Sequence, residues 1–349
     1  MPRRGVRAIR TGVLLTVALA LTGCAAGVEA GGSAPATSAP SGSSTSAGRS
    51  AGAGTSGPAP SAPGSSRPSS GPSSSAPSPP ATKAPPQLPR GGRTVFPRYR
   101  LVGYAGLPGA PALGRLGIGN LGARVAEIER WGRRYADGRT PLPVLELITT
   151  VVQGSPGANG LYNRHISDSV IARFLQAARR NHALLLLNIQ PGRAAFLPEV
   201  ERLRHWLEQP DVGLALDPEW AVGPGQVPMQ VFGHTTGTEL NQVSAWLSRL
   251  VRRHDLPQKV LVYHQLTDSI VRDPQALRPH PGVAVVQSVD GIGDRADKVQ
   301  TWRRLQKDRP AFVHPGFKLF FDEDRRTGPL MTPRQVLALK PTPEYVLYE

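Results

Sequence analysis

The chain has 349 residues, a formal net charge of +16 and a single cysteine. One cysteine excludes an intramolecular disulfide and a cysteine-based metal site. The basic excess favours anionic partners such as wall polymers, lipid head groups or acidic glycans, with a solvated basic surface as the alternative. We expect no nucleic-acid partner, because the sequence has no basic helix, zinc-finger spacing or basic–aromatic ribonucleoprotein motif.

The N-terminus has the pattern of a secretory signal. Four arginines within the first ten residues precede an uncharged, largely apolar run over residues 11–21, and that run is about half the ~20 residues of a membrane-spanning helix. Residues 21–24, LTGC, resemble the bacterial lipobox. This resemblance implies a signal peptide over 1–23, acylation of Cys24 and attachment to the outer face of the cell membrane through that lipid alone. The alternative is a chance cysteine beside an ordinary cleavage site.

Residues 24–93 consist almost wholly of Ser, Gly, Ala, Pro and Thr after the cysteine. Such a segment has too little apolar surface to offset the entropy of ordering, so we expect a disordered linker. Signal and linker together hold nine basic residues and one acidic residue, Glu29, which leaves a net charge of +8 for residues 94–349.

Residues 94–349 match the ~250 residues typical of one (β/α)8 barrel. Short β-rich apolar segments alternate with longer helical ones, as in repeated βαβ units. The predicted strands are Arg100–Gly106, Pro143–Val151, Leu184–Pro191, Val212–Trp220, Lys259–Thr267, Val283–Gly291, Phe317–Asp322 and Tyr345–Tyr348.

Helical patterns fill most of the intervals between these strands. In Glu239–His254 the apolar residues recur at three- and four-residue spacing, and Thr332-Pro333 is typical of a helix start. The other predicted helices are Leu121–Tyr135, Asp168–Asn181, Leu197–Glu208, Arg295–Gln306 and Pro333–Leu339.

Two features of the pattern depart from a regular barrel. The connection after the fifth strand contains three prolines, and no eighth helix follows Tyr348, so we expect the barrel to close on its last strand. A doubly wound open sheet is the alternative. No G-x-G-x-x-G stands between a strand and a helix to support it, because residues 117–122 have that spacing without the preceding strand.

Polar residues gather where the predicted strands end. In a (β/α)8 barrel these C-terminal ends hold the functional residues, and burying so many polar groups is costly unless they pair or face a wet cleft. We therefore predict a site at this end; mutual pairing in the top layer of the barrel is the alternative. The residues are Tyr104, Glu146, Gln190, Asp217, Glu219, His264, Gln265, Asp290, Lys318 and Asp322.

The segment LALDPEW holds the strongest catalytic candidates. If it continues the strand, Asp217 and Glu219 point to the same side, and their repulsion raises one pKa. A protonated carboxyl is what a general acid for glycosidic cleavage needs. Trp220 follows and offers a ring on which a sugar could stack.

This Asp-x-Glu at the fourth strand resembles that of family 18 and family 25 glycoside hydrolases. The resemblance implies that Glu219 is the acid and that Asp217 sets its protonation. Asp290, at the sixth strand, is predicted to act as a second carboxylate, with an Asp-Gly turn as the alternative. The first strand holds Tyr104 where family 25 has an aspartate.

A wider resemblance covers most of the domain. The segments LELITTVVQGSPG, NIQPGR, ALDPEW, KVLVYHQ, VDGIG and GFKLFFDED resemble an uncharacterised family of exported barrel lipoproteins from high-GC Gram-positive bacteria. That resemblance implies the barrel and brings no established reaction.

The remaining polar strand ends are predicted to bind substrate. Lys318 is expected to pair with Asp322, and the loops Gly154–Tyr162 and Gly223–Gly237 are candidate lids or ordinary surface loops. The predicted substrate-binding residues are Tyr104, Glu146, Gln190, Trp220, His264, Gln265, Lys318 and Asp322.

We expect no metal and no cofactor. His264 with Asp217, Glu219 and Asp290 would form a mixed nitrogen and oxygen set, but no H-x-H or H-E-x-x-H spacing supports it. The sequence thus predicts a monomeric, surface-anchored hydrolase of glycans, acting on a cell-wall or other envelope polysaccharide. The alternative is a noncatalytic barrel that binds a carbohydrate or another envelope ligand.

Overall fold

The structure, a computed structural model, describes residues 84–349. The expected signal peptide, the acylated Cys24 and most of the linker lie outside the described residues. The packed domain begins at Pro85, nine residues before the expected start at Thr94. No described helix is both long and apolar enough to cross a membrane.

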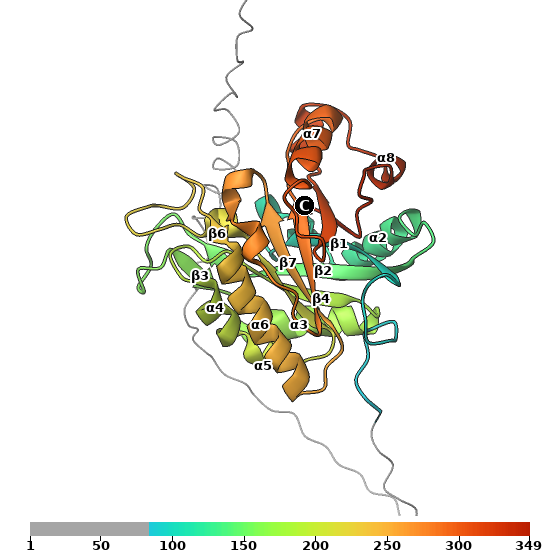
Figure 1. The fold of residues 1–349 in the computed structure, drawn as a ribbon, viewed down its shortest axis with the longest axis horizontal. Coiled ribbons are helices and arrows are strands. Elements are labelled where there is room, and N and C mark those ends of the chain that lie inside the picture. Colours follow the sequence, from blue (N-terminus) through green and yellow to red (C-terminus); the bar gives the residue numbers. More distant parts are fainter. Residues whose placement is uncertain (1–83) are drawn as a thin grey trace, which may run out of the picture. The chain divides into compact units, whose positions relative to one another are not determined.

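Eight parallel strands form a closed ring, as predicted (Figure 1). The ring closes because β1 (Tyr99–Gly106) pairs with β2 (Thr140–Val152) on one side and with β11 (Tyr345–Tyr348) on the other. Between them, in spatial order from β2, lie β4 (Leu184–Ile189), β5 (Val212–Leu216), β7 (Lys259–Gln265), β9 (Val283–Val289) and β10 (His314–Leu319).

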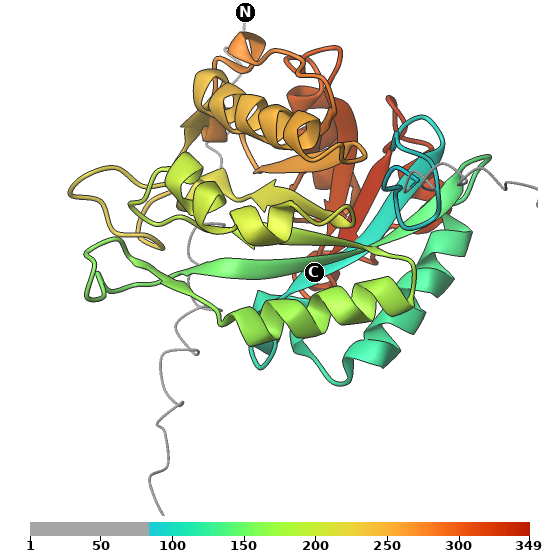
Figure 2. The same cartoon turned by 90° about the horizontal axis from the view of Figure 1, so that it is seen from below.

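Helices lie outside the ring (Figure 2). The longest, α6 (Gly237–Arg253), begins where the Thr236 side chain accepts a hydrogen bond from the Glu239 amide, and α8 (Pro333–Leu337) begins with the predicted cap at Thr332. The others are α2 (Leu121–Arg134), α3 (Asp168–Arg180), α4 (Phe196–Arg202), α5 (Arg204–Leu207) and α7 (Arg295–Leu305).

The proline-rich connection after β7 contains no α-helix. It forms short 3-10 turns and the two-residue strand β8 (Val271–Arg272), which pairs with β6 (Thr235–Thr236). Strand β2 continues past the ring and pairs with the antiparallel strand β3 (Asn163–His165).

Strict alternation along the strands separates two cores. Side chains such as Leu101, Val144 and Leu186 fill the barrel interior, whereas Val102, Leu145 and Leu187 face the helices. A Cβ on the inward Gly103 would lie 2.5 Å from a backbone oxygen of β2, so the interior requires glycine there.

The N-terminal ends of the strands, here called the base, are closed by residues 85–98. Leu88 and Val95 join the interior core, and Arg90 donates to the carbonyl oxygens of Pro141, at the start of β2, and His182, just before β4. The base therefore depends on residues that the sequence assigned partly to the linker. The C-terminal ends of the strands, here called the mouth, hold the polar groups.

Candidate active site at the barrel mouth

Six ionisable side chains meet at the mouth, all but one from inward positions within a strand or directly after it. The exception, Glu219, follows β5 by three residues. None is more than 7 % exposed, so their charges interact with little screening by water. This mouth cluster consists of Glu146, Asp217, Glu219, His264, Asp290 and Lys318.

His264 is the centre of the cluster. Its Nδ1 lies 2.7 Å from Asp290 Oδ2, and its Nε2 lies 2.9 Å from Glu146 Oε1. Burial alone would lower the pKa of His264, but the carboxylates of Asp290, Glu146 and Asp217 raise it well above its usual value. The imidazole is therefore protonated at neutral pH and holds β2, β7 and β9 together.

Lys318 supplies the second positive charge. Its Nζ lies 3.1 Å from Asp290 Oδ2 and 2.6 Å from Glu349 Oε2. The expected pair with Asp322 is wrong, because Asp322 follows the end of β10 and is exposed. Burial opposes ionisation of Asp290, yet His264 and Lys318 lower its pKa to about 2.

Glu146 is ionised although it is completely buried. Burial acts to raise its pKa, but His264 and Lys318 lower it below the usual value. Tyr345 Oη also donates to Glu146 Oε2 at 2.8 Å, so hydrogen bonding further favours the charged form.

Asp217 directly follows β5 and is the last side chain of that segment to face the barrel interior. Its Oδ1 accepts from Asn188 Nδ2 at 2.9 Å and its Oδ2 from Gln190 Nε2 at 3.2 Å. Burial nevertheless raises the pKa of Asp217, and the negative charge of Glu146 adds to the rise.

Glu219 does not continue the strand, so the expectation of strand alternation through Trp220 is wrong. Pro218 has no amide hydrogen for the strand ladder, and Pro218–Trp220 forms a 3-10 turn. The turn still brings the two carboxyl groups close enough to repel. Burial, and then repulsion from Asp217 and Asp290, raise the pKa of Glu219 well above its usual value.

Glu219 is also the least satisfied member of the mouth cluster. Its Oε2 is buried and has no hydrogen-bond partner among the described residues. Every other carboxylate of the cluster accepts at least one hydrogen bond. A buried carboxyl without a partner is costly unless it is protonated or meets a ligand.

Two predicted site residues, Tyr104 and Gln265, lie on the outward face. Tyr104 packs edge-on against Phe321 and Tyr348, and Gln265 accepts a hydrogen bond from the Gln287 amide. Trp220 is only 7 % exposed, which leaves little ring surface for a sugar.

Sequence reasoning missed four inward polar residues. The two-residue alternation of side chains along a strand could have identified them, because each lies an even number of positions from an apolar residue of the interior core. They are Asn188, Ser288, Tyr345 and Glu349, which hydrogen-bond members of the mouth cluster.

One set of donor atoms in the cluster suits a divalent cation. Single ligand atoms of Glu146, Asp217 and His264 lie within 4.8 Å of one another, and imidazole with carboxylates is a common donor set. Asp290, bonded to the other nitrogen of His264, has the position of an orienting partner rather than of a ligand. The atoms of Glu146 and Asp217 nearest His264 already accept from Asn188 Nδ2.

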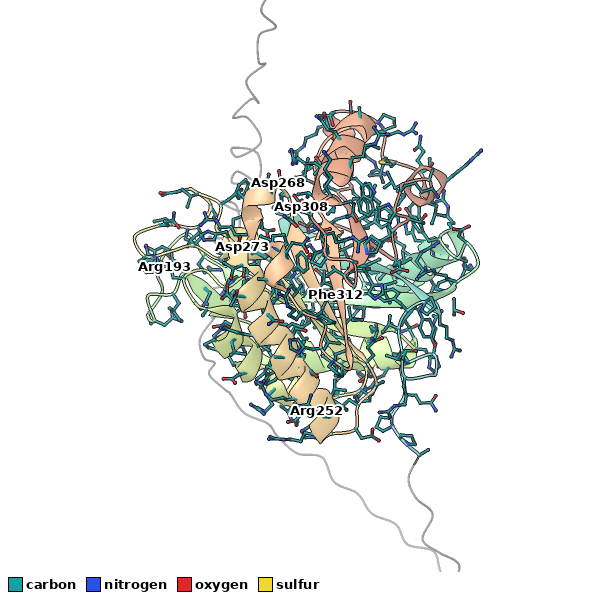
Figure 3. The ribbon with its side chains drawn as sticks, viewed as in Figure 1. Arg193, Arg252, Asp268, Asp273, Asp308 and Phe312 are labelled. Atoms are coloured by element: carbon teal, nitrogen blue, oxygen red, sulfur yellow. The ribbon has the colours of Figure 1, made fainter. Side chains whose placement is uncertain are left out.

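The two candidate lid loops are connected to each other. Gly192, after β4, accepts a hydrogen bond from the Val222 amide, and Arg193 lies 4.2 Å from the Tyr162 ring centre and donates to the Gln226 carbonyl oxygen. Figure 3 shows Arg193 among these protruding loops. The loops form one wall beside the mouth.

No family model, curated protein or solved structure matches this chain. The functional argument therefore depends on the geometry and charges of the mouth.

Proposed function

We propose that this protein is a hydrolase of glycans in which Glu219 is the general acid. The observation that carries the proposal is the state of its carboxyl group, which is buried beside Asp217, has an oxygen without a partner and has a pKa well above the usual value. A carboxyl that keeps its proton at neutral pH and has a free oxygen can donate that proton to a glycosidic oxygen. The (β/α)8 barrel is compatible with this chemistry.

Asp217 and Asp290 have different parts in the proposal. Asp217 lies beside Glu219, and its negative charge favours the proton on the acid. Asp290 accepts from Ser288 through one oxygen and contacts His264 and Lys318 through the other. Because both of its oxygens are engaged, Asp290 supports the charges of the cluster rather than attacking the substrate.

Glu219 is 7 % exposed, so a polysaccharide reaches it only when part of the mouth opens. The linked loops 154–162 and 223–237 are the candidates for this movement, since the Gly233 amide in the second loop donates to the Glu219 carbonyl oxygen. Loop movements that admit substrate and then exclude water are common in hydrolases.

The test is release of soluble sugar from purified wall and capsular glycans by the full-length chain and its Glu219→Gln variant. Glutamine keeps the shape of the protonated acid and removes the proton, so turnover should fall by a factor of about 10²–10⁴ while thermal unfolding is unchanged. Glu199→Gln is the control, since Glu199 is similarly buried but bonds His165 and Thr150 rather than any member of the mouth cluster.

A noncatalytic glycan-binding barrel is the second candidate. It is favoured by the internal pairing of Glu146, His264 and Asp290, which accounts for much of the charge in the mouth without a substrate. Tight binding of a glycan by both proteins, with no release of sugar under any condition, would establish this candidate in place of the hydrolase.

We further propose that the protein is held at the outer face of the membrane by a lipid on Cys24. The LTGC segment after a basic and then apolar N-terminus supports this. Labelled palmitate should be incorporated by the chain and not by its Cys24→Ser variant; equal labelling of both would contradict lipidation at this residue.

A further inference from the structure

Two cavities adjoin on the side of the barrel where β1, β10 and β11 end. One, of about 380 Å³, lies between the loops that follow β1 and β10. The other, of about 390 Å³, lies between β1 and α2. Arg115 and Phe321 line both cavities, and each volume is within the range of ligand sites.

Aromatic rings form a continuous stack beside these cavities. Phe321 stacks on Tyr348 with ring centres 5.1 Å apart, and Tyr348 stacks on Trp131 with centres 4.9 Å apart. Among the described residues no helix follows β11, so these rings cover its outer face in place of one. Both end members of the stack, Trp131 and Phe321, line a cavity.

Guanidinium groups accompany the rings. Arg134 lies 4.4 Å from the Trp131 ring centre, and Arg115 and Arg325 each lie 5.5 Å from that of Phe321. Four of the lining arginines form no ion pair within residues 84–349, namely Arg130, Arg134, Arg325 and Arg326.

The positive charge is most available in the second cavity. Its only acidic lining residue is Glu127, which is already paired with Arg115 and Arg124. The first cavity also contains Asp322 and Glu323 and is closer to electrically balanced. An anionic group is therefore favoured beside α2 rather than at the mouth.

The first cavity connects this surface with the mouth cluster. Glu349 lines the cavity, and its Oε2 accepts from Lys318 Nζ at 2.6 Å. A chain that lies across Phe321 thus extends from Glu349, which borders the mouth cluster, to the basic face of α2.

We infer that the two cavities form one binding groove for an anionic glycan, whose sugar rings lie along the aromatic side chains and whose carboxylate or phosphate groups contact the arginines beside α2. This Arg–aromatic groove consists of Arg115, Arg130, Trp131, Arg134, Phe321 and Arg325. Guanidinium groups bind both anions with paired hydrogen bonds and stack on rings. The inference names the substrate class for the proposed hydrolase and rests on that function only for the groove's link to Glu219.

The test measures calorimetric binding to the full-length Glu219→Gln chain, which removes turnover from the experiment. The probes are an oligogalacturonate, its neutral methyl ester and a phosphorylated mannan, so that carboxylate and phosphate are distinguished. Arg130→Gln combined with Arg134→Gln should weaken binding of the preferred anion roughly tenfold and reduce its salt dependence. Arg133→Gln is the matched control, being exposed on the same helix but outside both cavities.

The outcomes separate this inference from the proposed function. Binding that is equal for the acid and its methyl ester, equally weakened by Arg133→Gln, or absent for both anions overturns the anionic groove. If the groove binds as expected but the parent chain releases no sugar from that polymer, the hydrolase fails and the groove remains. Release of sugar that is unaffected by the double arginine variant leaves the hydrolase and rejects the groove.

Discussion

The base and the mouth of this barrel both bury charge, but they satisfy it differently. At the base, Lys259 donates to the backbone carbonyl oxygens of Gln209 and Val212 and is 1 % exposed, and Arg100 donates to the carbonyl oxygen of Tyr135. At the mouth, charged side chains contact one another, with His264 between Glu146 and Asp290.

The difference distinguishes a structural end from a chemical one. Carbonyl oxygens are fixed by the backbone and carry no titratable charge, so the hydrogen bonds of Lys259 and Arg100 to them do not depend on the protonation of an acceptor. The mouth has more carboxyl groups than cations, and the excess keeps the pKa of Glu219 high. Groups with displaced pKa values in one place are typical of catalytic sites, although ion-pair networks share this property.

The largest expected effect is at the centre of the mouth. His264→Leu leaves Glu146 without the cation it contacts and Asp290 with Lys318 as its only cation, which should cost about 3–5 kcal/mol of the free energy of unfolding. Urea unfolding at pH 7 measures it, with His205→Leu, at an exposed position on α5, as the control. Similar losses for the two variants would mean that the network contributes nothing to stability.

A pH-dependent effect is expected at the base. Burial lowers the pKa of Lys259 from 10.5 to about 7, so between these values the unfolded chain binds more protons and this residue makes stability rise with pH. Relative to that of the Lys259→Met variant, the free energy of unfolding of the parent chain should rise by roughly 2 kcal/mol between pH 7 and pH 9. A stability difference that stays constant across this range would show that Lys259 titrates normally.

The mouth should show the same direction on the acid side, where stability again rises with pH. Because the pKa of Asp290 falls from 3.8 to about 2, its contribution is complete above pH 3.8 and is lost as the pH falls through 2. The destabilisation caused by Asp290→Asn should therefore shrink by about 2 kcal/mol between pH 7 and pH 2. Denaturant unfolding at both pH values tests this, and an unchanged difference would refute the low pKa.

The smallest expected effect is on sugar release, after substitution of two glutamines that lie on opposite faces of the barrel wall. Gln190 donates to Asp217 in the interior, whereas Gln265 contacts Gln287 outside it. Once a substrate is known, Gln190→Leu should lower sugar release about tenfold or more, because it removes a hydrogen bond to a charged group. Gln265→Leu should change it less than about twofold, and the reverse order would place the site elsewhere.

Much of the fold followed from local pattern. Apolar runs such as Lys259–Gln265 and Tyr345–Tyr348 predicted strands within two residues of those observed, because a strand buried on both faces requires a continuous apolar run. Thr332-Pro333 predicted the start of α8, since capping and a fixed proline φ act within one turn. The barrel count came from the alternation of these segments.

The site was predicted only in part. Buried polar side chains face the barrel interior near the mouth at Glu146, Gln190, His264, Asp290 and Lys318, as the sequence predicted. Tyr104 and Gln265 lie one position out of phase with them and face the helices. Period-two counting from Leu101 and Val262 would have separated these classes.

The sequence by itself determined an eight-stranded parallel barrel with polar groups at its C-terminal end, because propensity, periodicity and turn chemistry act over a few residues. Only the tertiary structure decided which charges meet. Pro218 turns Glu219 out of the strand, Lys318 pairs with Glu349 rather than Asp322, and the chain before Thr94 closes the base. The last two contacts join residues far apart in the chain, and the energies of the buried charges depend on burial, which arises only when the barrel closes.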